Sequence, residues 1–215
     1  MNRALALCLC LTIVPASAFA EVELSFYGGV QSAPSSDVSI RGDDVIADDD
    51  FSQDWEGRSA EAPIYYGFRA TRWRSPTFGY GLDFAHNKVY PENDDLPAGY
   101  DVLEFTDGLN TLTVNAYRRW NQAFGEVTPY VGGGLGFALP HVEVTNGASE
   151  TFGYQLTGPA ATVIAGASYD INEQWSVFGE YKGTFSSNTA DLDTGGTLET
   201  DIVTNAVNVG VSFNF

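Results

Sequence analysis

Val207-Asn-Val-Gly-Val-Ser-Phe-Asn-Phe215 is the stretch of sequence that decides the fold. Hydrophobic residues occupy every second position, and asparagine, glycine or serine stands between them. Successive side chains of a β-strand point to opposite faces, so this period of two predicts a strand with one apolar and one polar face. The apolar series ends on the aromatic Phe215.

The same alternation recurs in seven earlier segments, separated by stretches rich in glycine or acidic residues. Each segment is near the ten or so residues that a tilted membrane strand requires. No segment with a helical period competes with them. The eight segments are 22–30, 63–74, 78–90, 109–120, 127–139, 154–169, 174–185 and 202–215.

The connections between these segments alternate in length. The short ones are 74–77, 121–126 and 170–173, and the long ones are 31–62, 91–108, 140–153 and 186–201. Short turns on the periplasmic side and long loops outside are typical of an outer-membrane barrel. The sequence therefore predicts an all-β fold, an eight-stranded antiparallel up-and-down transmembrane β-barrel.

The N-terminal residues have the features of a signal peptide. A short positive start precedes the apolar run Ala4–Val14, and Ala18-Phe-Ala20 offers small residues to a signal peptidase. We expect residues 1–20 to be cleaved and residues 21–215 to form one domain in the cell outer membrane. Both cysteines fall in the cleaved part, so the mature chain has none for a disulfide or a metal site.

The chain is strongly acidic, with a formal net charge of −18. A nucleic-acid surface needs clustered Lys and Arg, so this charge balance excludes nucleic acid as a partner. The expected partners are the outer-membrane lipid bilayer and its lipopolysaccharide. The final strand ending in Phe215 also resembles the signal that the barrel assembly machinery reads during biogenesis.

Four charged residues are predicted to point into the barrel. Eight strands make a barrel just wide enough for its side chains to fill. A charge buried there requires a partner. We expect an interior ionic network in which Lys182 is the cation for Glu180; its members are Arg69, Asp83, Glu180 and Lys182.

His86 and His141 are the two histidines of the chain, and each comes where the apolar face of an upward strand stops. Without a bulge, both side chains point outward at the height of the lipid head groups, whereas a bulge turns them inward. The strand between them carries Asp107 near its upper end, and Glu143 follows His141.

Two imidazoles with one or two carboxylates form a donor set for a redox-active divalent metal such as iron. They also form an acid/base set. His86, His141, Asp107 and Glu143 are therefore the candidate catalytic and metal-binding residues, and Lys88 is the candidate partner of a lipid A phosphate. The open alternative is that two histidines decorate a rim that is polar anyway.

Several stretches resemble the lipid A oxidase family, within the broader group of OmpA-like small barrels. They are Phe105–Asn115, Thr128–Val144, Gly153–Pro159, Glu180–Lys182 and Thr204–Ala206. The resemblance implies oxygen-dependent oxidation of the proximal glucosamine of lipid A to 2-aminogluconate. It assigns no residue roles. The competing interpretation is a non-catalytic OmpA-like barrel whose acidic outer loops bridge calcium or magnesium to lipopolysaccharide phosphates and so stabilise the membrane.

Overall fold

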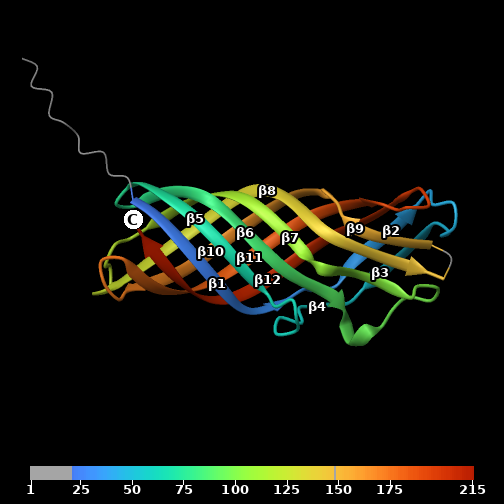
Figure 1. Ribbon diagram of the computed structural model, residues 1–215, viewed down its shortest axis with the longest axis horizontal. Helices are drawn as coiled ribbons and strands as arrows, with labels where there is room; N and C mark the ends of the chain where they lie inside the picture. The colour runs from blue at the N-terminus through green and yellow to red at the C-terminus, as the bar shows by residue number, and fades with distance from the viewer. Residues whose placement is uncertain (1–20, 148) are drawn as a thin grey trace, which may run out of the picture.

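The computed structural model is an elongated barrel of tilted strands (Figure 1). It describes residues 21–147 and 149–215, so the expected signal peptide, with both cysteines, lies outside the described residues. Eight antiparallel strands close the ring, because the last one pairs with the first. This confirms the predicted eight-stranded barrel. In ring order the strands are β1(Glu21–Ser32), β5(Tyr66–Ser75), β6(Phe78–Pro91), β7(Val102–Arg119), β8(Val127–Asn146), β10(Gly158–Asp170), β11(Trp175–Asp191) and β12(Thr197–Asn214).

The strand register sorts side chains strictly between the two faces of the wall. The apolar set points outward and stays exposed, with Leu135 at 73% and Val209 at 70%. Neighbouring residues of opposite parity are buried inside the ring, as in the alternating pattern of β11. A belt of exposed apolar side chains would be unfavourable in water and suits contact with lipid. Phe68, Phe84, Leu112 and Phe137 are paired in one row of this outward face.

The long connections are more ordered than the sequence predicts. β7 begins at Val102 rather than at 109, and β8 continues to Asn146 rather than stopping at 139. Short strands join them at the end of the barrel opposite the C terminus (Figure 1). These are β2(Ser36–Arg41), β3(Asp49–Gln53), β4(Trp55–Glu56) and β9(Ser149–Tyr154), with the short 3₁₀ turn η1(Glu92–Asp94). β2 pairs with β12, β3 with β2, β4 with β6, and β9 with β8.

A hydrophobic core inside this outer extension explains why the wall continues past the lipid-facing belt. Alternating apolar residues such as Leu103 and Phe105, or Val142 and Val144, point inward beyond the predicted strand ends. They pack against Ile40 of β2, which is fully buried. Burying these side chains stabilises the extra pairs. The interior thus has a polar zone level with the belt and an apolar zone above it.

No helix in the described part of the chain is long and apolar enough to cross a membrane.

Candidate functional site

The four interior charges lie together in the polar zone of the lumen. Arg69 donates from Nε to Asp83 at 2.8 Å and from its two terminal nitrogens to both oxygens of Glu180, at 2.8 and 3.0 Å. Lys182 forms an ion pair with Asp83. Tyr130 donates a further hydrogen bond to Glu180 at 2.7 Å. Two cations and two carboxylates therefore balance in a space sealed from solvent.

The expected pairing of Lys182 with Glu180 is wrong. Glu180 takes the bidentate fork of Arg69, and Lys182 reaches across the lumen to Asp83. The two residues are two apart on β11, so their side chains leave the strand side by side, toward the opposite wall. A planar guanidinium matches a carboxylate with two parallel bonds, which a lysine cannot do.

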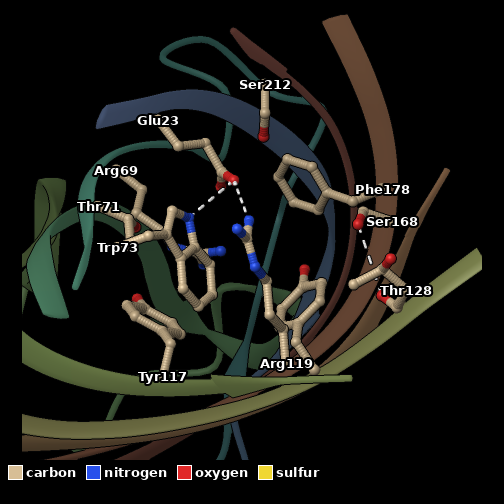
Figure 2. Close-up of a pocket in the computed structure, with 11 residues that line it drawn as sticks. Glu23, Arg69, Thr71, Trp73, Tyr117, Arg119, Thr128, Ser168, Phe178 and Ser212 are labelled. Carbon is tan, nitrogen blue, oxygen red and sulfur yellow. Dashed lines mark hydrogen bonds and ion pairs between the residues drawn. The ribbon is translucent and has the colours of Figure 1, made fainter. Parts of the chain in front are cut away.

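The periplasmic mouth of the lumen is closed by a second set of contacts (Figure 2). Figure 2 shows the Glu23 carboxylate between Trp73 and Arg119, and it accepts a hydrogen bond from Trp73 Nε1 at 3.2 Å. The Arg119 guanidinium lies 3.8 Å from the centre of the Trp73 ring and pairs with Glu21 at 2.9 Å. The cavity behind them has a volume of about 30 Å³. This is room for a water molecule rather than for a substrate.

His86 lies on the outward face of the wall, one row above the apolar row that contains Phe84. It is three residues from the lumen-facing Asp83, so its side chain points the other way. Tyr66 and Asn110 flank it in the register. Its ring stacks on Tyr66 with centroids 5.1 Å apart, and its Nδ1 lies 2.8 Å from Asn110 Oδ1.

A bulge in β7 buries His86 without turning it inward. The register of β7 shifts against both neighbours, between Glu104 and Leu109 on the β8 side. Gly108 lies in this bulge with φ +88°, and a Cβ there would come within 2.6 Å of the His86 ring. Only glycine fits both the left-handed backbone and the close approach. The side chain is consequently only 5% exposed, and its Nε2 is buried with no hydrogen-bond partner in the described structure.

His141 also faces outward, since its neighbour Val142 packs in the inner core. β9 covers it. Phe152 and Tyr154 meet the imidazole edge-on, with centroids 4.3 and 4.7 Å away. The side chain is 4% exposed, and its Nδ1 has no hydrogen-bond partner among the described residues. Each histidine therefore has one buried ring nitrogen that no described residue contacts by a hydrogen bond.

The acidic candidates lie on the same outward side. Asp107, half-buried in the β7 bulge, acts electrostatically on both His86 and Tyr154. Glu143 is half-buried and lies opposite Glu104 in the register of β7 and β8. Within residues 21–147 and 149–215, however, no three His, Cys, Asp or Glu side chains gather closely enough to hold a metal ion. The expected donor set does not fit a metal in this arrangement.

The expectation for Lys88 is wrong. Its side chain is fully buried, and Nζ donates to the Tyr90 hydroxyl at 2.7 Å while lying 4.5 Å from the centre of that ring. The segment around β4 pairs with the upper end of β6, the strand that carries Lys88. A lipid A phosphate cannot reach a cation enclosed in this way.

Three residues that contact the histidines were not predicted from the sequence: Tyr66, Asn110 and Tyr154. All are paired directly with a histidine in the strand register. Parity counting of the neighbouring strands would have placed Tyr66 and Asn110 beside His86 once the register was known. Tyr154 is the last residue of β9, and the rest of β9 lies outside the predicted segment 154–169. The alternation therefore did not indicate the contact of Tyr154 with His141.

Comparison with known proteins gives one family and a set of similar folds. The model of the outer membrane protein beta-barrel domain matches residues 6–215. OprG from Pseudomonas aeruginosa is 12% identical, with a TM-score of 0.50 over 92% of this chain and 96% of that one. Neisserial surface protein A is 14% identical, with a TM-score of 0.49 over 91% and 97%. No curated protein matches.

Proposed function

The chain belongs to the outer membrane protein beta-barrel family, and from that premise we propose that it oxidises lipid A at its outer rim. The protein resides in the outer membrane. The lipid A of the outer leaflet is the substrate that we propose for it. The proposed substrate group is the proximal glucosamine, and the product is 2-aminogluconate. The resemblance of the segments around Asp107, His141 and Glu143 to lipid A oxidases supplies this choice of reaction.

One observation carries the proposal: two outward-facing histidines each hold a buried nitrogen with no hydrogen-bond partner among residues 21–147 and 149–215. Leaving a buried polar atom unsatisfied costs about 1–3 kcal/mol. Such a cost in a native protein calls for an explanation, and a bound polar ligand is a direct one. His86 lies one row above the apolar row of Phe84, and His141 lies one outward row higher in the register. The proposal places both beside the sugars of lipid A. A sugar supplies the hydroxyl groups that the two nitrogens lack.

In the described part of the chain, the cavity beside Arg69 and Tyr117 has a volume of about 30 Å³, which is too small for a sugar. The ionic network of Arg69 occupies the lumen at the level of the belt, and the contacts of Arg119 close its periplasmic mouth. The apolar core fills the extension above it. A substrate embedded in the outer leaflet meets the outward face first, so chemistry on that face requires no passage into the barrel.

The proposed reaction balances with oxygen and water as co-substrates. The C1 aldehyde carbon of the ring-opened glucosamine loses two electrons and becomes a carboxylate, and water supplies the added oxygen. Molecular oxygen takes up the two electrons with two protons and leaves as hydrogen peroxide. Because the donor set does not fit a metal, no step is assigned to one. The residues of the chain contribute binding, orientation and proton transfer.

The test is the mass of lipid A from cells that express the protein and from cells that do not. The host is one whose own lipid A is unoxidised and has a free hydroxyl group, rather than a phosphate, at C1 of the proximal glucosamine. A gain of one oxygen atom in expressing cells grown in air supports the proposal. His86→Ala and His141→Ala should lose the gain, whereas Gln174→Ala, in an exposed turn at the other end of the barrel, should keep it. Full activity in both histidine variants would end the proposal.

A second candidate, a non-catalytic barrel, is favoured by the filled interior and by the acidic outer connections. Asp43, Asp44 and Asp48 lie near the tip of the β2–β3 hairpin and are mostly exposed. Carboxylates of this kind are ligands for calcium and magnesium, which would join them to lipopolysaccharide phosphates. Lipid A of unchanged mass, together with leakier cells when the protein is deleted, would favour this function.

A further inference from the structure

A chain of hydrogen bonds behind His86 determines which of its ring nitrogens carries the proton. Asn110 Nδ2 lies 3.4 Å from the backbone oxygen of Asp107 and donates to it. The carbonyl end of the same amide, Oδ1, therefore faces His86 Nδ1 at 2.8 Å. An amide oxygen can only accept a hydrogen bond. Nδ1 of His86 must be the donor, which leaves Nε2 without a proton in the neutral ring.

We infer that His86 is held as the Nδ1–H tautomer by Asn110, and that its Nε2 accepts a proton from a hydroxyl group of the lipid A sugar. This inference rests on the proposed function. Asn110 is then a positioning residue, since it touches His86 and acts through it. The ligand class of the site is a sugar hydroxyl, whose hydrogen is the one donor that the buried Nε2 lacks.

The proton transfer is a complete step. The O–H bond of the C1 hydroxyl breaks, its proton bonds to Nε2, and the electron pair stays on the sugar oxygen. That pair forms the C1 carbonyl as the ring C–O bond breaks, and the ring oxygen takes a proton from solvent. The product is the open-chain aldehyde that the proposed oxidation consumes.

Tyr66 is the cover that the substrate has to displace. Its ring stacks on the His86 imidazole, and its own side chain is only half-buried, so it is reached from the lipid side. Tyr66 is the first residue of β5, at the end of the segment that follows β4. A sugar ring that replaces the phenol against the imidazole gains access to Nε2. Gly108 closes the edge of the imidazole at Cε1 and Nδ1, where an added Cβ would clash.

His141 lacks an equivalent partner. Its ring meets the edges of Phe152 and Tyr154, and Nδ1 has no partner in the described structure. The amide that fixes the tautomer of His86 is therefore not repeated at His141. The ring nitrogens of the two histidines should therefore give different NMR spectra. His86 should show the Nδ1–H tautomer alone.

The experiment is nitrogen NMR of the full mature barrel in lipid nanodiscs, labelled at histidine. Because the chain has two histidines, a His141→Gln variant assigns both sets of signals. The parent should show a protonated Nδ1 and an unprotonated Nε2 for His86. Asn110→Leu should lose that preference, and Asn110→Asp, which keeps an acceptor oxygen, should retain it. Heat-dependent gel migration checks that each variant is folded.

An Nε2–H tautomer in the parent, or an unchanged His86 spectrum in a folded Asn110→Leu variant, overturns the inference. The same variants are assayed for lipid A oxidation. Loss of a general base reduces rates by about 10²–10⁴-fold, so His86→Gln should fall in that range and Asn110→Asp should recover activity relative to Asn110→Leu. An inactive parent overturns the proposed function and the proton transfer, while the spectrum still decides whether Asn110 sets the tautomer.

Discussion

Replacing Arg69 with methionine removes the residue that joins the two carboxylates of the lumen. Its three hydrogen bonds, of 2.8 Å to Asp83 and of 2.8 and 3.0 Å to Glu180, are all buried. Glu180 would keep only neutral partners, among them Tyr130. Breaking a buried ion pair by removing one partner costs about 3–5 kcal/mol. We expect Arg69→Met to lower the free energy of unfolding by that amount.

The double variant Arg69→Met with Glu180→Gln tests whether the cost is electrostatic. It leaves Lys182 paired with Asp83, so the lumen is again neutral. The destabilisation should then fall to about 1–3 kcal/mol, the cost of hydrogen bonds left unmade. Lys182→Met alone should be milder than Arg69→Met, because Asp83 keeps both Arg69 and the Tyr27 hydroxyl as partners.

The assay is urea unfolding in lipid vesicles, followed by tryptophan fluorescence and by heat-modifiable gel migration. Arg72→Met is the matched control, since Arg72 lies on the same strand with an exposed side chain. It should change stability by less than about 0.5 kcal/mol. If Arg69→Met were no less stable than Arg72→Met, the lumen would have to contain water that solvates Glu180, and the sealed interior would be refuted.

Two further predictions concern assembly and the rim. Phe215→Asp should leave the chain unassembled in the periplasm, because a charge replaces the apolar side chain that directly follows the closing strand β12. Phe124→Asp, at an equally exposed position in a turn, should assemble. Phe215→Asp protein that is exposed at the cell surface and heat-modifiable would contradict this. Gly108→Ala should shift the NMR signals of His86, whereas Gly99→Ala, with a similar φ of +98° and no atom near its Cβ position, should not. Identical His86 signals in both glycine variants would show that the bulge does not hold the ring.

The period of two was sufficient to predict the ring of strands. Val207–Phe213 pairs with both neighbours along its length, and its valines point outward as the alternation requires. Parity also predicted that His86 and His141 would face outward in the absence of a bulge. Their outward direction survives because the extra residues are inserted in β7 rather than in the strands that carry the histidines.

What the sequence did not reveal depends on contacts between distant segments. The burial of His86 comes from the β7 bulge at Gly108, and a bulge leaves no periodic signal. The cover over His141 comes from β9, in a connection that was expected to be a loop. The partner of Glu180 could not be chosen from the sequence of β11 alone, because Arg69 approaches from the opposite wall only after the ring has closed.

The most direct test of the account is the mass of lipid A with a free C1 hydroxyl group on its proximal glucosamine, incubated with the purified barrel in vesicles, in air and without oxygen. We predict that lipid A gains one oxygen atom in air and hydrogen peroxide appears in equal amount. Neither change should occur without oxygen or with both His86 and His141 replaced by glutamine. An unchanged mass with the folded parent protein, or the same gain with both histidines replaced, would contradict the central claim.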